Sequence, residues 1–192
     1  VWSTNTNTPY KIEHYKQKND GTYRDEADET ENRTGTTGST VVAEQKNYNG
    51  YTYDIGKSNP TGTVEGDGSL VLKLYYKANT STGYKVEHYK QKADGSYSNV
   101  ADETENLSGT TGESVNAIAK EYAGYTEDTE NSNRIASGTI VGDRSLVLKL
   151  YYKANTSTGY KVEHYKQKAD GSYGDVADET ENLSGTTGES VK

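Results

Sequence analysis

The chain has 192 residues, of which 30% are apolar and 26% charged, and its formal net charge is −8. An acidic chain is a poor partner for double-stranded nucleic acid, and the absence of cysteine excludes disulfides and thiolate metal sites. No segment approaches 18 consecutive apolar residues, so we expect no membrane insertion. Val, Ile, Leu and Phe make up only about 14% of the chain, which favours disorder, but the 18 tyrosines offer an aromatic core instead.

The chain is an internal repeat. Residues 10–17 return almost unchanged at 84–91 and again at 160–167, so the period is about 75 residues. Polar Ser/Thr/Asn/Gly segments separate the copies and are typical of short linkers. We therefore predict a linker tail at 1–9, repeat modules at 10–77 and 84–153, linkers at 78–83 and 154–159, and a partial third module at 160–192.

The second repeat shows the expected elements in chain order. Alternating apolar residues predict a strand at 84–89, and an Asp-Gly turn follows within 93–96. Further on, the patterns predict a weak strand at 96–104, turns at 107–112, a weak alternation at 114–119, a possible short helix at 117–122, and a strand at 135–141.

The strongest strand signal lies at 145–152. Leu146, Leu148 and Leu150 share one face of this segment, and Lys149 lies on the other. A strand with one apolar and one mixed face favours an antiparallel sheet with one side in water. We predict a mainly β fold of about 70 residues per repeat, with four or five strands and at most one short helix.

The order of motifs resembles a known family. The motifs are Leu-Ser-Gly-Thr-Thr-Gly-Glu-Ser-Val at 107–115, Tyr-Ala-Gly-Tyr at 122–125 and Leu-Val-Leu-Lys-Leu-Tyr-Tyr at 146–152. This set resembles the mucin-binding-protein-type (MucBP-like) repeats of Gram-positive surface proteins. The resemblance implies tandem β-grasp (ubiquitin-like) modules arranged end to end in an extracellular, wall-anchored adhesin, and mucin binding in some members. The chain departs from the pattern at His88 and contains no Leu-Pro-x-Thr-Gly wall-anchoring motif.

The sequence offers few candidate catalytic or metal-binding side chains. Each repeat has a single histidine, at 14, 88 and 164, which we expect to be a partly buried strand residue. The acidic run at 101–106 is interpreted as a solvated face and Gly-Thr-Thr-Gly at 109–112 as a turn. Lys149 is the best-placed lysine for an isopeptide crosslink, but no partner can be assigned to it. We predict no enzyme activity, no metal site and no cofactor.

Tyrosine is the remaining candidate for ligand contact, because phenol rings stack on sugar faces. The candidate ligand-binding residues are Tyr122, Tyr125, Tyr97, Tyr48 and Tyr51. The competing interpretation is that these rings form the core that the missing aliphatic residues cannot form.

Three functional hypotheses follow. The near-identical repeats and the lack of site chemistry favour a structural spacer, or stalk, that holds an adhesive domain away from a cell wall. Alternatively, the repeats bind host mucin or glycans weakly and gain avidity by repetition. A third possibility is self-association through open sheet edges. In each case the neighbouring repeats of the same chain are also partners.

Overall fold

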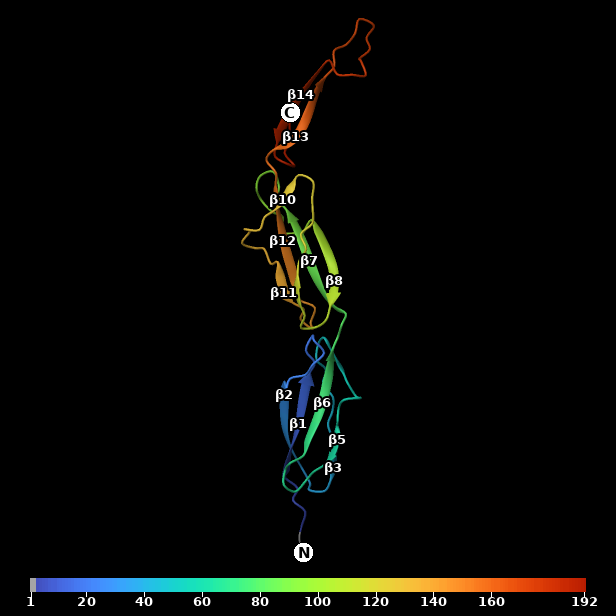
Figure 1. The fold of residues 1–192 in the computed structure, drawn as a ribbon, viewed down its shortest axis with the longest axis vertical. Helices are drawn as coiled ribbons and strands as arrows, with labels where there is room; N and C mark the ends of the chain where they lie inside the picture. Colours follow the sequence, from blue (N-terminus) through green and yellow to red (C-terminus); the bar gives the residue numbers. More distant parts are fainter. Residues whose placement is uncertain (1–2) are drawn as a thin grey trace. The chain divides into compact units, whose positions relative to one another are not determined.

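A computed structural model describes residues 3–192, and in that range the chain forms strands joined by turns and loops, without a helix (Figure 1). The prediction of a mainly β repeat is thereby confirmed. Residues 117–122, where the sequence allowed a short helix, have no regular structure. The strands are β1 (Thr8–Lys16), β2 (Glu29–Gly35), β3 (Thr40–Val42), β4 (Tyr51–Tyr53), β5 (Thr61–Thr63), β6 (Val71–Ala78), β7 (Thr82–Lys90), β8 (Glu103–Gly109), β9 (Ser114–Asn116), β10 (Tyr125–Glu127), β11 (Ser137–Thr139), β12 (Val147–Ala154), β13 (Thr158–His164) and β14 (Glu179–Gly185).

The contacts within the chain divide it into two units. The first contains the residues up to Tyr84 together with 106–115 and 137–146, and the second contains 85–105, 116–136 and 147–192. The first unit therefore holds the whole first repeat and two turn-containing segments of the second. The second unit holds most of the second repeat and the hairpin of the third.

The main sheet of the first repeat has the strand order β2-β1-β6-β4. Strands β2 and β4 pair antiparallel with their neighbours, but the central strands β1 and β6 run parallel, with Lys11 opposite Val71 and Lys16 opposite Tyr76. The expectation of an antiparallel sheet is wrong at this pair. A parallel pair needs a long crossover, and the residues between β1 and β6 provide it with β3 and β5, which form a second small sheet.

Apolar and polar residues alternate strongly along β6, and this pattern explains why β6 lies in the middle of the sheet. Leu72, Leu74 and Tyr76 are completely buried and pack with Ile12 and Ala43 in the main core. Full burial of each leucine contributes about 1.5–3 kcal/mol. The opposite face of the sheet is only partly exposed to solvent, because tyrosine rings stack there. Tyr15 and Tyr75 lie with ring centroids 4.9 Å apart, and Tyr23 meets Tyr75 edge-on at 5.0 Å.

The second repeat has the equivalent sheet order, β10-β12-β7-β8, with β7 and β12 parallel. Leu148 and Leu150 are buried on β12, as the alternation predicted, and Tyr152 is buried on the same face. The second strand lies at Glu103–Gly109 and not at 96–104, and β10 was not predicted. In the third copy, β13 and β14 form an antiparallel hairpin in the same register as β1 and β2.

Candidate functional site

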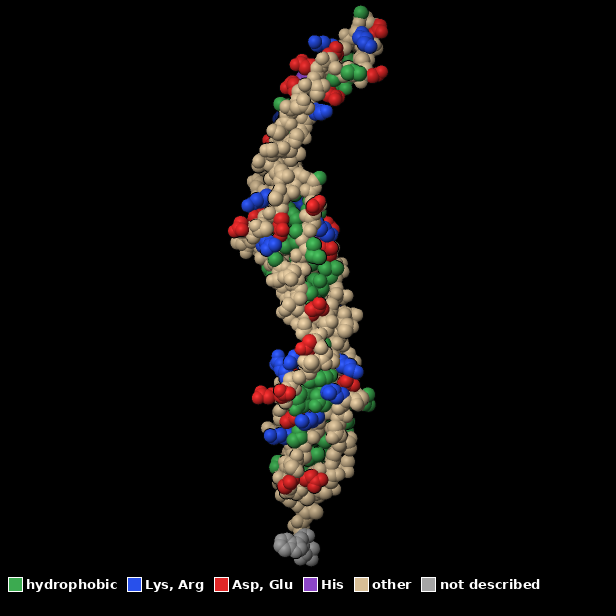
Figure 2. Space-filling view, in the orientation of Figure 1, with side chains coloured by type: hydrophobic (Ala, Val, Ile, Leu, Met, Phe, Trp, Pro, Cys, Tyr) green, Lys and Arg blue, Asp and Glu red, His purple; other side chains and the backbone are tan. Residues whose placement is uncertain are grey.

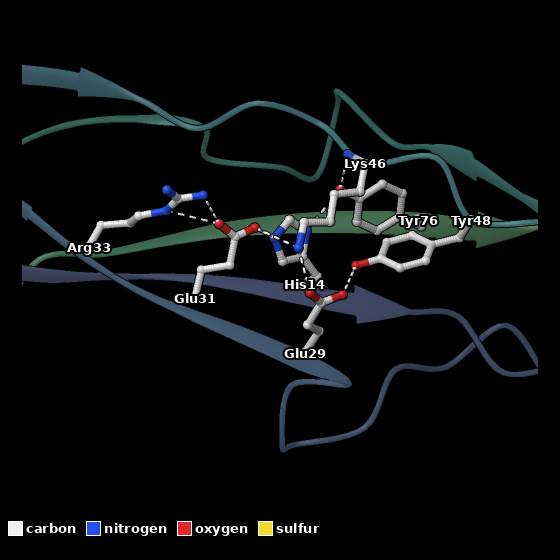
Figure 3. A network of polar contacts seen from close by, with 7 residues as sticks. All are labelled: His14, Glu29, Glu31, Arg33, Lys46, Tyr48 and Tyr76. Atoms are coloured by element: carbon white, nitrogen blue, oxygen red, sulfur yellow. Dashed lines mark hydrogen bonds and ion pairs between the residues drawn. The ribbon is translucent and has the colours of Figure 1, made fainter.

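A buried histidine is the centre of the polar structure in each sheet. His14 on β1 has no exposed surface. Its Nδ1 lies 2.9 Å from the Tyr76 hydroxyl oxygen, and its Nε2 lies 3.0 Å from Oε1 of Glu31 (Figure 3). The backbone N–H of Lys46 donates to the same tyrosine hydroxyl at 3.0 Å. The expectation of a partly buried histidine therefore underestimated its burial.

One assignment of protons satisfies every group in this chain of contacts. The Glu31 carboxylate can only accept, so Nε2 of His14 carries the hydrogen. The Tyr76 hydroxyl then donates to Nδ1 and accepts from Lys46. A neutral imidazole in this tautomer leaves no buried donor or acceptor of the ring without a partner, which is the condition for burying it at low cost.

A cluster of charged side chains surrounds the glutamate that binds the histidine. The ammonium of Lys46 pairs with Glu29 and, at 2.8 Å, with Glu31, while Arg33 also binds Glu31. The Tyr48 hydroxyl donates to Glu29 at 2.6 Å. We call His14, Glu29, Glu31, Lys46, Tyr48 and Tyr76 the histidine network.

The charges of the histidine network shift its acid–base properties. The hydrogen bonds from Lys46 and then Arg33 lower the pKa of Glu31 to about 2. Lys46 and Tyr48 likewise lower the pKa of Glu29. Burial, followed by the hydrogen bond to Glu29, raises the pKa of the Tyr48 hydroxyl. The two carboxylates therefore stay ionised and the Tyr48 phenol stays neutral near pH 7.

The second repeat contains the same network in different residues. Nδ1 of His88 lies 2.9 Å from the Tyr152 hydroxyl, and Nε2 lies 2.8 Å from Glu105. Lys120 again donates its N–H to the tyrosine hydroxyl, at 3.0 Å. The remaining members are Glu103, which pairs with Lys120, and Tyr122, whose hydroxyl donates to Glu103 at 2.6 Å. Leu107 stands where the first repeat has Arg33.

Sequence reasoning missed this arrangement, although a signal for it exists. A glutamate follows each histidine after 17 residues, and His164 with Glu181 forms the third such pair, at 2.7 Å. The run at 101–106 was interpreted as a solvated acidic face, but its Glu105 bonds the histidine and its Glu103 accepts from Tyr122.

The groups of the network hold one another within the repeat. Its carboxylates are held by lysine and tyrosine, and its imidazole nitrogens are both occupied. Within residues 3–192, no three His, Cys, Asp or Glu side chains are placed to hold a metal ion. No helix in the same range is long and apolar enough to cross a membrane.

The five candidate tyrosines are all half-buried. Tyr48 and Tyr122 belong to the two histidine networks, and their rings meet Tyr76 and Tyr152 edge-on. Their outer faces carry lysine: Lys16 lies 4.3 Å from the Tyr48 centroid and Lys90 lies 4.3 Å from the Tyr122 centroid.

The other three candidates lie elsewhere. Tyr97 meets Tyr151 edge-on and donates to Asp128 at 3.1 Å. Burial, followed by this hydrogen bond, raises the pKa of Tyr97 to about 12. Tyr51 and Tyr125 begin β4 and β10 at equivalent positions. Tyr51 lines a groove of about 260 Å³. The groove is completed by Lys16, Gln17, Lys18, Asn19, Arg24, Asp28, Thr111 and Gly112.

Comparison with known proteins gives two relatives, both named Internalin J, from Listeria monocytogenes. The chain is 32% identical to the serotype 4b protein over 120 residues and 31% identical to the serovar 1/2a protein over 125 residues. These matches cover 62% and 65% of this chain but only 12% and 14% of the relatives, so the chain corresponds to a small part of each. No family model matches the chain.

Among solved structures, the chain is similar to the type 2 repeat of the mucus binding protein MUB from Lactobacillus reuteri. The identity is 13% and the TM-score 0.24, over 76% of this chain and all of the other.

Proposed function

We propose that this chain is a non-enzymatic spacer made of tandem repeats in an extracellular, cell-surface adhesin. The observation that carries the proposal is the histidine network, which is repeated in two copies with every charged group held by another group of the same repeat. Such a network stabilises a core that has few aliphatic residues. It supplies no group that is free to react.

The surface and the sequence relationships agree with this role. Figure 2 shows a face dominated by uncharged polar atoms and backbone, with acidic and basic side chains interspersed. The likeness to a part of Internalin J supports a repeat segment within a longer protein. The modules of this spacer are those predicted above, at 10–77 and 84–153, followed by the third from 160.

The test changes the number of repeats. One, two and four copies of residues 84–159 are placed between a wall anchor and a reporter domain on a bacterial surface, and atomic force microscopy measures the reporter's height. A spacer raises the reporter with each added copy, whereas an unchanged height contradicts the proposal. An equally long Gly/Ser-rich segment is the matched control, because a flexible chain extends only as the square root of its length.

Direct binding of host mucin or glycans is the second candidate. The groove beside Tyr51 supports it, because an aromatic ring lies there among polar and basic side chains that hydrogen-bond hydroxyl groups. Tyr51→Ala and Tyr125→Ala, compared with the parent chain on a mucin array, test this role. Loss of binding with an intact fold supports it. Equal binding by parent and variants assigns contact to other residues, and no binding by the folded parent removes the candidate.

A further inference from the structure

A turn of the second repeat is inserted against the end of the first. Thr111, in the Gly-Thr-Thr-Gly turn, is 4% exposed and belongs by its contacts to the first unit. Its N–H donates to the carbonyl of Asn79 at 2.9 Å, and its hydroxyl donates to the carbonyl of Gly50 at 3.0 Å. The Thr82 hydroxyl oxygen lies 2.7 Å from the Thr111 hydroxyl oxygen. The turn is therefore hydrogen-bonded to backbone groups that lie more than 30 residues away.

The two backbones meet so closely that only glycine fits. Gly50 has φ +79°, and a Cβ on it would lie 2.6 Å from Oγ1 of Thr111 and 2.4 Å from Cα of Gly142. A Cβ on Gly142 would lie 1.9 Å from the carbonyl oxygen of Asn49. Real Cβ atoms do not approach other atoms so closely, so a side chain at Gly142 must push the turn off the first repeat. We call Asn49, Gly50, Asn79, Thr82, Thr111 and Gly142 the junction.

The same bonds recur once more in the second unit. The N–H of Thr187 donates to Asn155 at 2.9 Å, and its hydroxyl donates to Gly124 at 2.8 Å. Gly124 has φ +80°, and its Cβ would lie 2.6 Å from Oγ1 of Thr187. Near the start of the chain, Thr37 makes the corresponding bond to the carbonyl of Asn5 at 2.9 Å. The Thr-Thr-Gly turn thus has the same partners wherever a residue stands before it to accept the bonds.

We propose that the Thr-Thr-Gly turn is the docking element by which each repeat binds the end of the repeat before it. The receiving surface consists of the Gly50 and Asn79 carbonyls, and the partner it fits is the next copy of the same repeat. Only three residues, 79–81, separate β6 from β7, so the second repeat begins directly after the segment that receives the turn. The inference rests on the proposed spacer function and adds that neighbouring repeats stabilise each other, as in other repeat arrays.

Amide hydrogen exchange in the full 192-residue chain tests the junction with a matched pair of variants. Gly142→Ala places a Cβ against Asn49. Gly66→Ala makes the same change at the equivalent turn of the first repeat, where the Cβ would meet only Thr37, at 3.5 Å. We expect Gly142→Ala to lower the protection of the Thr111 amide by about tenfold or more, because its bond to the Asn79 carbonyl opens locally. Gly66→Ala leaves this protection unchanged.

Two results would overturn the proposal. In one, Gly142→Ala changes Thr111 protection no more than Gly66→Ala does. In the other, Gly142→Ala lowers protection equally at Leu148 in the sheet, which shows that it unfolds the repeat and not the junction. Thr111→Val serves as a second variant that keeps the side-chain shape and removes the hydroxyl bond to Gly50, and it should lower the protection of the amide at position 111, which bonds the Asn79 carbonyl. Hydrogen exchange tests the junction without surface display, so its outcome is independent of the height measurement that tests the spacer function.

Discussion

Removing one hydroxyl from the core is the sharpest test of the histidine network. Tyr152→Phe deletes the oxygen that bridges His88 Nδ1 and the Lys120 N–H, and it hardly changes side-chain shape. Two polar groups then lose their partner. An unsatisfied buried group costs about 1–3 kcal/mol, so the free energy of unfolding of this repeat should fall by about 2–6 kcal/mol. That is a large share of the stability of a domain this small.

The neighbouring tyrosine provides the control. Tyr151 is buried on the opposite face of the same strand, and within residues 3–192 its hydroxyl makes no hydrogen bond, so Tyr151→Phe should change stability by less than about 0.5 kcal/mol. Urea unfolding followed by circular dichroism measures both variants. Equal effects of the two substitutions would refute the argument that the hydroxyl, and not the ring, is required.

A double-mutant cycle separates hydrogen bonding from packing. His88→Leu with Tyr152→Phe replaces both partners by apolar groups, so it should cost less than the sum of the single substitutions, by about 1 kcal/mol or more. Additive costs would show that the two side chains do not act together.

Three further predictions concern the core, the charges and the turns. Leu148→Ala should lower the free energy of unfolding in urea by about 2–5 kcal/mol, because Leu148 is completely buried. The lowered pKa of Glu31 stabilises the fold above its ordinary pKa of 4.5, and this stabilisation is lost as the pH falls toward 2. Lys46→Met removes the main cause, so acid unfolding should begin at a higher pH, and an unchanged acid midpoint would contradict this. Gly50→Ala should destabilise more than Gly38→Ala in thermal unfolding, since both have positive φ but only Gly50 has close neighbours.

Strand predictions succeeded where one face of a strand is apolar. The alternation of leucine and tyrosine in β6 and β12 is a local pattern, and burial of that face follows from it directly. β8 was misplaced because its segment, Glu-Thr-Glu-Asn-Leu-Ser-Gly, has no apolar alternation, and its inward glutamates are tolerated only beside a histidine and a lysine. β10 is three residues long and exists because it pairs with β12.

The candidate site was only partly predictable. Tyrosine rings were expected to act as core or as ligand contacts, and three of the five are committed to hydrogen bonds within their repeat. Which tyrosine hydroxyl meets which carboxylate depends on the parallel pairing of strands about 60 residues apart. No local pattern encodes that pairing. Gly-Thr-Thr-Gly at 109–112 was likewise interpreted only as a turn, because the partners of Thr111 lie in the preceding repeat.

The parallel pairing of β1 with β6 has a mechanical consequence. In the sequence, β1 is the first and β6 the last strand of the first repeat. In the sheet the two lie side by side and are paired from Lys11–Val71 to Lys16–Tyr76 (Figure 1). When the chain is pulled from both ends, the load acts along the two strands in opposite directions, so their hydrogen bonds are sheared together and cannot open one at a time. A repeat with this pairing should therefore resist extension most strongly along the direction in which the chain enters and leaves it.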